Sequence, residues 1–255
     1  MKYDVKLCEI LKKSEIAPGI FDVTVRAGEI AAAAQPGQFA HLLAPGKTLR
    51  RPISICEIDK GAGTLRFVFQ VRGEGTDLLS QFDVGDAYDI LGPLGNGFQL
   101  GDTSRRALFV GGGIGVPPLL EAAKAFGKNA VAVLGFRNRD AVILKEDFER
   151  YGCKVLIATD DGSAGFHGLV TDCMKDEPAD VIFACGPGPM LRAVCAAAEG
   201  RGIPCQISLE ERMACGIGAC LGCACRLRRE DGTAFFGHVC KDGPVFDYQT
   251  VVWEG

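Results

Sequence analysis

Four cysteines near the carboxyl end constrain this chain more than any other feature. Cys215, Cys220 and Cys223 follow the spacing C-x4-C-x2-C, and Cys240 comes later in the chain. Thiolate sulfur is a soft ligand that holds iron in tetrahedral coordination. The spacing is that of a plant-type 2Fe–2S site, in which one loop supplies three ligands and a later residue supplies the fourth. The sequence therefore predicts a 2Fe–2S centre bound by these four cysteines.

Glycines accompany these cysteines at Gly216, Gly218 and Gly222. Residues without a Cβ let backbone N–H groups turn toward the sulfurs. A zinc site remains an alternative, although it favours two C-x2-C pairs and this run holds one. A Rieske centre needs two histidine ligands, and His238 alone lies nearby. Cys225 lies just beyond the third ligand, and we expect it to be a buried thiol outside the cluster.

The overall composition argues against several classes of protein. With 28 Lys and Arg against 32 Asp and Glu, the chain offers no basic surface for nucleic acid. Charge-free runs such as Ala107–Leu120 are broken by Gly and Pro and fall short of the ~18–20 apolar residues of a membrane span. Residues 1–13 carry charge throughout. We therefore expect no signal peptide and a cytoplasmic protein whose thiols are reduced.

Up to about residue 100, the sequence predicts a six-stranded antiparallel β-barrel. Short runs, several with alternating polar and apolar residues, are separated by turns such as Gln35–Gly37 and Gly92-Pro93. One short helix is expected after Gly75-Thr76. An open sandwich is the alternative to a closed barrel. The predicted strands are Tyr3–Leu11, Ile20–Arg26, Gln38–Leu43, Pro52–Ile58, Thr64–Val71 and Ala87–Leu91.

From Arg106 onward, apolar strands alternate with helical segments. This alternation is typical of a Rossmann-like parallel α/β sheet with crossover helices. The boundary with the barrel is expected near Gly101–Ser104. Strands are predicted at Ala107–Val110, Ala130–Phe136, Lys154–Thr159, Val181–Cys185 and Pro204–Leu209, with helices at Pro117–Phe126, Ala141–Arg150, Val170–Lys175 and Pro189–Gly200.

A motif that suits a flavin opens one barrel strand. Arg51 and Ser54, in the spacing R-x-x-S, place a guanidinium and a hydroxyl where they can converge on one bound group. Arg51 then suits the pyrophosphate of a flavin dinucleotide and Ser54 the edge of its ring. Gly75-Thr76 would add N–H groups of a helix N-terminus for the same phosphates. Taken alone, Arg51 is better explained as a solvated surface charge.

Two glycine-rich strand ends predict one nucleotide-binding crevice. Gly111–Gly115 ends a strand and opens a helix, although Pro118 stands where G-x-G-x-x-G has its third glycine. Cys185–Met190 ends a later strand in the same way. Ordinary tight turns between strand and helix are the alternative. The adenosine end would lie near Arg137–Arg139, which suit a 2′-phosphate or simply form a surface turn.

Together these motifs resemble the ferredoxin reductase superfamily. Arg51–Ser54 matches its R-x-Y/F/I-S flavin motif, with isoleucine in place of the usual aromatic residue. Gly111–Pro117 matches the GGGIGVxP loop, and Cys185–Met190 matches the CGPxPM segment that borders the nicotinamide. The run Ser208–Cys220 and the segment Asp160–Ser163 resemble the electron-transfer subunits of class B dihydroorotate dehydrogenase. The resemblance covers essentially the whole chain.

The resemblance implies FAD, NAD and a 2Fe–2S cluster. It divides the chain into an FAD-binding barrel (1–102), a NAD-binding α/β domain (103–206) and a small cluster-binding domain (207–255). Nicotinamide exchanges two electrons at once and the cluster one, whereas FAD exchanges either number. The implied residues are Arg51, Pro52, Ile53, Ser54, Val68, Phe69, Gln70, Gly75 and Thr76 for FAD; Gly111, Gly112, Gly113, Gly115, Cys185, Gly186 and Pro187 for NAD; and Cys215, Cys220, Cys223 and Cys240 for iron.

The resemblance also implies a partner subunit. This would be an FMN-containing catalytic subunit that oxidises dihydroorotate to orotate in pyrimidine (UMP) biosynthesis, in a heterotetramer with two copies of each chain. Electrons would pass from that FMN through the cluster and FAD to NAD+. Two alternatives stay open. One is a flavin and iron–sulfur subunit of a hydrogenase or of a ferredoxin–NAD(P) transhydrogenase, and the other is a non-catalytic protein that holds its tail with zinc.

Overall fold

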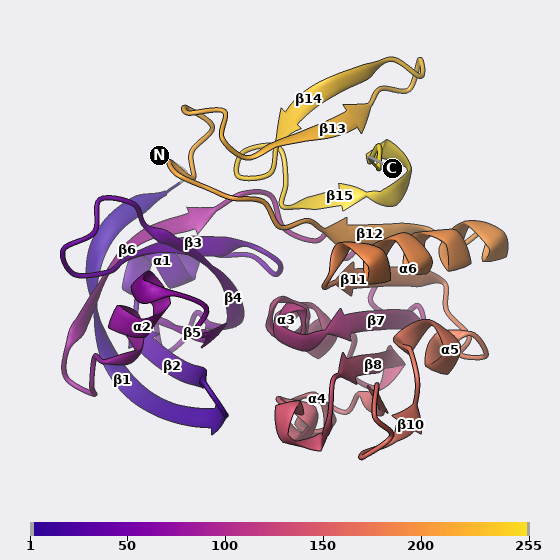
Figure 1. The fold of residues 1–255 in the computed structure, drawn as a ribbon, viewed down its shortest axis with the longest axis horizontal. Helices are drawn as coiled ribbons and strands as arrows, with labels where there is room; N and C mark the ends of the chain where they lie inside the picture. The colour runs from indigo at the N-terminus through magenta and orange to yellow at the C-terminus, as the bar shows by residue number, and fades with distance from the viewer. Residues whose placement is uncertain (1–2, 254–255) are drawn as a thin grey trace. The chain divides into compact units, whose positions relative to one another are not determined.

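The computed structural model describes residues 3–253, and these divide into two compact units (Figure 1). One unit, called the barrel unit here, comprises Met1–Gly97, Glu210–Cys225 and Gly237–Pro244. The other, the sheet unit, comprises Phe98–Leu209, Arg226–Phe236 and Val245–Gly255. The segment after residue 209 therefore contributes to both. The three-part division by cofactor is a different division of the chain and stays a prediction.

The barrel unit is built on a closed antiparallel barrel of six strands, as predicted. Apolar side chains that alternate along each strand point inward, for example Val23 and Val25, which are fully buried. Closure leaves no unpaired strand edge, so the open sandwich is excluded. In barrel order, the strands are β1 (Asp4–Ala17), β2 (Ile20–Arg26), β5 (Thr64–Gln70), β4 (Arg51–Asp59), β3 (Phe39–Leu43) and β6 (Ala87–Leu94).

Two short helices accompany the barrel, whereas the sequence predicted one. The predicted helix is α2 (Glu74–Ser80), and the buried Tyr88 hydroxyl donates a 2.6 Å hydrogen bond to the Leu79 carbonyl within it. The helix missed is α1 (Gly28–Ala33), which has no side-chain cap. Its Ile30 belongs to the barrel core. A helix this short depends on tertiary packing, which sequence periodicity does not reveal.

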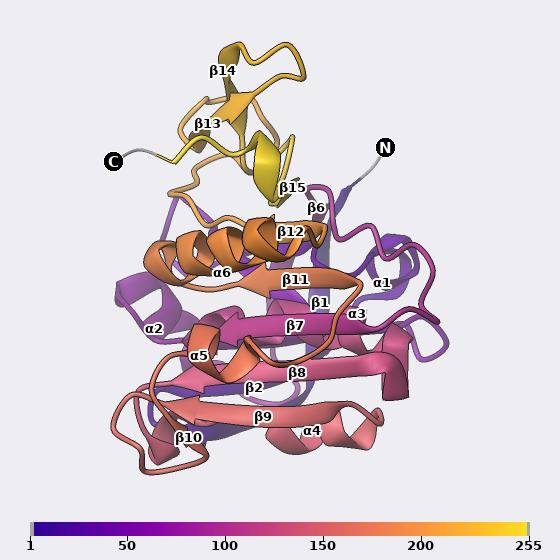
Figure 2. The same ribbon diagram turned by 90° about the vertical axis from the view of Figure 1, so that its right-hand side faces the viewer.

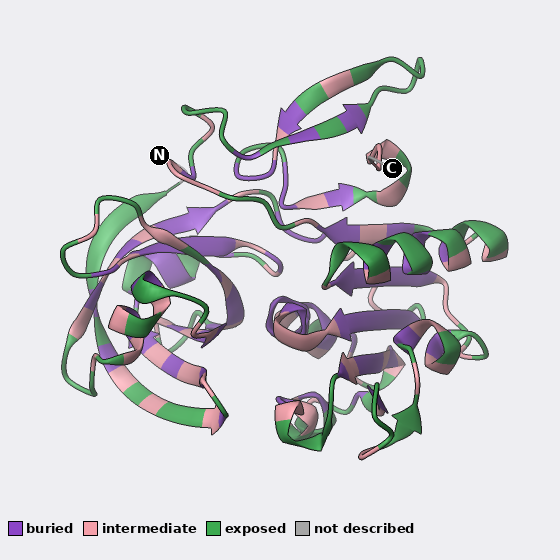
Figure 3. Ribbon diagram, viewed as in Figure 1, coloured by how far each residue is buried: buried purple, intermediate pink, exposed green. Residues whose placement is uncertain are grey.

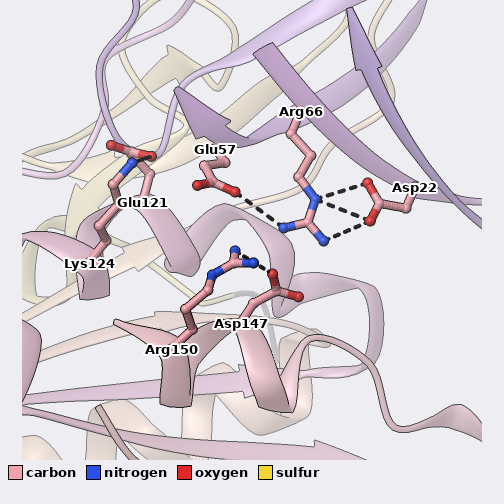
Figure 4. Close-up of polar contacts among 7 residues, drawn as sticks. All are labelled: Asp22, Glu57, Arg66, Glu121, Lys124, Asp147 and Arg150. Carbon is pink, nitrogen blue, oxygen red and sulfur yellow. Dashed lines mark hydrogen bonds and ion pairs between the residues drawn. The ribbon is translucent and has the colours of Figure 1, made fainter. Parts of the chain in front are cut away.

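A network of charged side chains ties three barrel strands together (Figure 4). Arg66 on β5 donates to both carboxylate oxygens of Asp22 on β2, at 2.7 to 3.1 Å. The same guanidinium lies 3.2 Å from Glu57 on β4. The three side chains are 15% to 19% exposed, so their hydrogen bonds are shielded from water. Figure 4 also draws two ion pairs of the sheet unit, Arg150–Asp147 and Lys124–Glu121.

The sheet unit holds a seven-stranded sheet with helices on both faces, as expected for a Rossmann-like domain. Helices α3 and α4 lie on one face and α5 and α6 on the other (Figures 1 and 2). The sheet order is β10 (Phe166–His167), β9 (Lys154–Thr159), β8 (Ala130–Phe136), β7 (Ala107–Gly112), β11 (Val181–Cys185), β12 (Cys205–Ser208) and β15 (Val245–Asp247). The helices are α3 (Pro117–Phe126), α4 (Lys145–Arg150), α5 (Val170–Met174) and α6 (Gly188–Arg201).

The central strands of this sheet are buried on both faces (Figure 3). Phe109 on β7 and Phe183 on β11 stack with ring centroids 5.0 Å apart. Phe126 of α3 packs edge-on against Phe109 at 5.6 Å. Strands covered on both sides lack polar alternation, which is why they read as continuous apolar runs.

The carboxyl-terminal segment adds strands that the sequence analysis did not predict. β15 pairs antiparallel with β12, so the predicted last strand is not the edge of the sheet. β13 (Ala224–Arg228) and β14 (Ala234–His238) form a separate two-stranded sheet. β15 has three residues, too few for a periodic pattern, and forms because it pairs with the free edge of β12. Within residues 3–253, no helix is both long enough and apolar enough to span a membrane.

Candidate cofactor sites

The four predicted iron ligands lie in two pairs in the barrel unit. The Cys223 and Cys240 sulfurs are 3.2 Å apart and buried. The Cys220 N–H donates to the Cys215 sulfur at 3.4 Å, and the Cys220 side chain lies close enough to help lower the pKa of Cys215. Over residues 3–253, no three His, Cys, Asp or Glu side chains converge on one point where a single metal ion would sit. In a 2Fe–2S centre each iron takes two protein ligands, whereas structural zinc gathers four around one ion. Two pairs of thiols therefore fit the binuclear centre.

The loop between the first two cysteines turns its backbone N–H groups toward sulfur. Gly216 and Gly218 have φ angles of +71° and +81°, a region that side chains with a Cβ rarely adopt. This conformation lets the loop curl around the thiols. The donors to the Cys215 sulfur are the N–H groups of Ile217 (3.5 Å), Ala219 (3.2 Å) and Cys220 (3.4 Å), and the Gly218 N–H donates to the Cys240 sulfur (3.2 Å).

The N–H donors and burial give these cysteines different pKa values. Partial burial opposes ionisation of Cys215, yet the N–H groups of Ile217 and Cys220 outweigh it and lower the pKa to about 6. Burial, together with the neighbouring Cys223 thiol, raises the pKa of Cys240 to about 12. Burial also raises the pKa of Cys225 to about 11, as suits a thiol outside the ligand set. The thiols must lose their protons when iron binds, so loading releases protons.

The predicted flavin residues Arg51 and Gly75 meet in the structure. A Cβ added to Gly75 would lie 1.9 Å from the Arg51 Nε, so the guanidinium packs directly against the first turn of α2. The Thr76 hydroxyl accepts hydrogen bonds from the N–H groups of Arg72 and Gly73 and thereby caps that helix. A cation and the start of a helix side by side suit a phosphate better than either alone.

The register of β4 decides which of its side chains face outward. Pro52 is opposite His41 of β3, and Ser54 is opposite Phe39, so these four side chains share one face of the sheet. Ile53, in contrast, is 8% exposed and belongs to the barrel core. Its side chain points away from the face that carries Ser54. Of the other predicted flavin residues, Val68 and Phe69 are buried and Gln70 is half-buried.

The two predicted nucleotide loops of the sheet unit pack against each other. β7 and β11 are neighbours, and Gly111 is opposite Cys185 at the end of both strands. A Cβ on Gly115 would lie 2.5 Å from the Cys185 carbonyl oxygen, and one on Gly112 would lie 2.6 Å from the Met190 sulfur. A Cβ on Gly113 would meet nothing within 4 Å. Several glycines of this loop are therefore required by loop-to-loop contact, and Gly113 leaves open space for a ligand.

The arginines expected near adenosine belong to a surface turn. The Arg139 N–H donates to the Ser163 hydroxyl (2.7 Å), and its guanidinium donates to the Ser163 carbonyl (2.6 Å). Ser163 in turn donates to the Asp161 carboxylate (2.6 Å). These bonds hold the segments 137–139 and 160–163 together, and they occupy the Arg139 guanidinium.

Two polar residues near these sites escaped the sequence analysis. Ser208 is 5% exposed and lies opposite Cys185 at the same sheet edge. His41 is fully buried next to the loop of residues 215–223, called the cysteine loop from here on. Ser208 opens the run Ser208–Cys220, but that motif gave it no role, and His41 is an isolated histidine within an apolar strand. Only the tertiary arrangement brings them to the sites.

A closed antiparallel barrel, a parallel α/β sheet and a four-cysteine loop together define the class of iron–sulfur proteins with a ferredoxin reductase-like fold. Residues 210–252 match the family model described as the iron–sulfur cluster binding domain of dihydroorotate dehydrogenase B. The chain is 44% identical over 253 residues to the dihydroorotate dehydrogenase B (NAD(+)) electron transfer subunit of Geobacillus thermodenitrificans, covering 95% of this chain and 96% of that protein. The corresponding subunit of Streptococcus mutans is also 44% identical, over 252 residues and the same shares of both chains. The chain belongs to this family of electron transfer subunits.

Solved structures agree with the fold. The chain matches a structure of an NADH-dependent reduced ferredoxin–NADP oxidoreductase with a TM-score of 0.86 and 33% identity, covering 97% of this chain and 90% of the other. A ferredoxin reductase of carbazole 1,9a-dioxygenase matches with a TM-score of 0.68 over 79% of this chain and 67% of the other. At 21% identity, the second match shows the fold alone.

Proposed function

We propose that this chain is the electron transfer subunit of a NAD-linked class B dihydroorotate dehydrogenase. The observation that carries the proposal is the pairing of four thiols in a family whose members are named as such subunits. When bound, the 2Fe–2S centre exchanges single electrons, NAD+ accepts a hydride, and FAD exchanges electrons singly or in pairs. The chain's own residues hold, orient and electrostatically tune these groups.

The cysteine loop would hold the iron with Cys215 and Cys220 as one pair and Cys223 and Cys240 as the other. Its N–H groups point at the Cys215 sulfur, so the loop conformation suits the hydrogen bonds that a bound centre would accept. Hydrogen bonds to sulfur stabilise the more negative, reduced state and so raise the reduction potential. The buried pair keeps water away from one side of the centre, while the Cys220 side lies at the surface.

The flavin and nicotinamide would lie on the glycine-rich surfaces already described. Arg51 and the start of α2 supply positive charge and N–H donors for a pyrophosphate, and Ser54 presents a hydroxyl on the outer face of β4. At the carboxyl edge of the parallel sheet, Gly113 leaves room for a dinucleotide to approach the backbone. The remaining predicted contacts of FAD and NAD belong to this proposal.

The partner we propose is an FMN-containing catalytic subunit, in a cytoplasmic heterotetramer with two copies of each chain. The relatives are named electron transfer subunits, which implies that another chain oxidises dihydroorotate. Electrons would leave that subunit, cross the iron–sulfur centre and FAD of this chain, and reduce NAD+. The exposed position of Cys220 suits a centre that exchanges electrons with a partner.

The test is reconstitution of the two co-expressed subunits after anaerobic purification. Cys220→Ser should lose iron and abolish NAD+ reduction by dihydroorotate, while NADH oxidation by an artificial acceptor through FAD persists. Cys225→Ser is the matched control, since Cys225 lies in the same segment outside the ligand pairs, and it should keep both iron and activity. Full dihydroorotate-dependent activity in iron-free Cys220→Ser would refute this electron path.

A second candidate, supported by the solved-structure match at 33% identity, is a subunit of a ferredoxin–NADP oxidoreductase of the transhydrogenase type. The identity of about 44% to the dihydroorotate dehydrogenase subunits favours the first candidate. Identifying the subunit that co-purifies with the natively expressed chain decides between them. An FMN-containing subunit that oxidises dihydroorotate supports the first, and one that reacts with ferredoxin supports the second.

A further inference from the structure

His41 lies between the barrel and the cysteine loop, inside the barrel unit. Ala40 and Leu42 point into the barrel core, so their neighbour His41 points to the outer face of β3. That face is covered, because His41 is 0% exposed. A Cβ added to Gly216 would lie 2.7 Å from the His41 Cε1 and 2.9 Å from each ring nitrogen. The turn that follows the first predicted iron ligand therefore rests directly on the imidazole.

The imidazole is buried without a hydrogen-bond partner. Among buried side-chain polar atoms in residues 3–253, only the two ring nitrogens of His41 and one nitrogen of Arg201 lack a partner. Burial, and secondarily the nearby Arg50 guanidinium, lowers the pKa of His41 to about 4. A neutral imidazole carries one N–H donor and one acceptor nitrogen. A buried donor is normally paired, because an unsatisfied one keeps its full desolvation cost. The His41 N–H can therefore donate to a bound group at this position.

The surroundings indicate which group that is. On one side, His41 is opposite Pro52 of the predicted flavin strand, and Pro52 is exposed while His41 is covered. On the other side lies Gly216, in the loop whose N–H groups already converge on sulfur. The predicted centre carries net negative charge on its sulfurs, which accept hydrogen bonds from neutral N–H groups. An imidazole covered by the cysteine loop suits this acceptor better than a flavin ring beyond the exposed Pro52.

We propose that His41 is a positioning residue of the iron–sulfur centre: its ring supports the Gly216 turn, and its N–H donates a hydrogen bond to a sulfur of the bound centre. The bond would stabilise the reduced state and raise its reduction potential. Through β3 and β4, it would also link the centre to the strand that carries the predicted flavin residues. This inference rests on the proposed iron–sulfur function.

The first test compares matched variants in the iron-loaded subunit bound to its partner. His41→Leu and His41→Met remove the donor, whereas His41→Asn and His41→Gln place an amide N–H where one or the other ring nitrogen was. We expect the midpoint potential, measured by EPR-monitored titration, to fall in the Leu and Met variants. A tenfold change in the redox equilibrium corresponds to about 59 mV for one electron. At least one amide variant should restore the wild-type potential.

Iron and acid-labile sulfide content are measured on the same samples. If the wild-type chain holds no iron, the proposed function fails and the role of His41 falls with it. If every variant keeps its iron and the Leu and Met variants have the wild-type potential, the proposed function stands and the inference about His41 is wrong. The two failures are thereby distinguished.

A second measurement does not depend on whether the His41 variants fold. The chain has three histidines, and His41 alone lies against the Gly216 turn. Labelling histidine with the heavy stable nitrogen isotope should shift one weak nitrogen coupling in the pulsed EPR spectrum of the reduced wild-type centre. His238→Gln, whose histidine is next but one to Cys240 in the chain, should leave the shifted coupling in place. No isotope-sensitive histidine coupling, or its loss in His238→Gln, would overturn the inference.

Discussion

Adding one methyl group at Gly115 should separate the two nucleotide loops of the sheet unit. The new Cβ would lie 2.5 Å from the Cys185 carbonyl oxygen, 2.7 Å from its carbonyl carbon and 2.7 Å from the Gly186 Cα. All three are backbone atoms at the end of a central strand, so none moves aside as a flexible side chain would. Overpacking a close-packed interior costs about 1–3 kcal/mol. At about 2–4 °C per kcal/mol for a chain of this size, the melting temperature should fall by about 2–12 °C.

The matched control is Gly188→Ala, three positions beyond Cys185 in the opposite loop. A Cβ there meets nothing within 4 Å, and the position opens α6, where alanine is tolerated better than glycine. Thermal unfolding by circular dichroism measures stability, and titration with NADH measures binding. Gly115→Ala should lose both stability and NADH affinity, while Gly188→Ala keeps both. A Gly115→Ala protein that melts with the wild type and binds NADH equally well would refute the argument from close contact.

Two further predictions concern other contacts. Gly75→Ala would place a Cβ 1.9 Å from the Arg51 Nε, so it should displace the guanidinium and reduce the FAD occupancy of the purified chain. Gly73→Ala is the control, because a Cβ there meets nothing within 4 Å, and it should keep the FAD occupancy of the wild type. Equal flavin content in the two variants would contradict the assignment. Hydrogen bonds from Arg106 lower the pKa of Asp180 from 3.8 to about 2. An unfolded Asp has a pKa of about 4, so this pair stabilises the fold above that pH. The stabilisation is lost as the pH falls toward about 2. Asp180→Asn should therefore melt below the wild type at neutral pH and converge with it in acid, and a gap independent of pH would be inconsistent with this linkage.

The parts of the fold that were predictable are those with a strong local pattern. Most barrel and sheet strands appear close to their predicted ranges because alternation and continuous apolar runs report which faces are buried. The exception is β1, which continues to Ala17 beyond its predicted end at Leu11. The helix α3 begins at Pro117 and ends at Phe126, as predicted. In contrast, α1 and β15 were missed, since each is short and exists only because a neighbouring element offers a surface or an edge.

The candidate site, too, was predictable from the sequence only where its pattern is local. The spacing of Cys215, Cys220 and Cys223 predicted a loop around sulfur, and the loop's N–H groups do point at sulfur. The separation of the thiols into two pairs required Cys240 to return from a distant part of the chain. Ile53 is among the residues implied for FAD, and only the register of β4 showed that its side chain points into the core.

The sequence by itself determined the kind of chemistry, because ligand type and spacing along a loop are local properties of the chain. It also determined the order of barrel, sheet and cysteine loop, because hydrophobic periodicity is local as well. Only the tertiary structure decided that a solitary histidine of β3 lies under the Gly216 turn with both ring nitrogens unpartnered. That contact joins residues far apart in the chain. An unpaired polar group is costly only when it is buried, and burial arises only once the chain has folded.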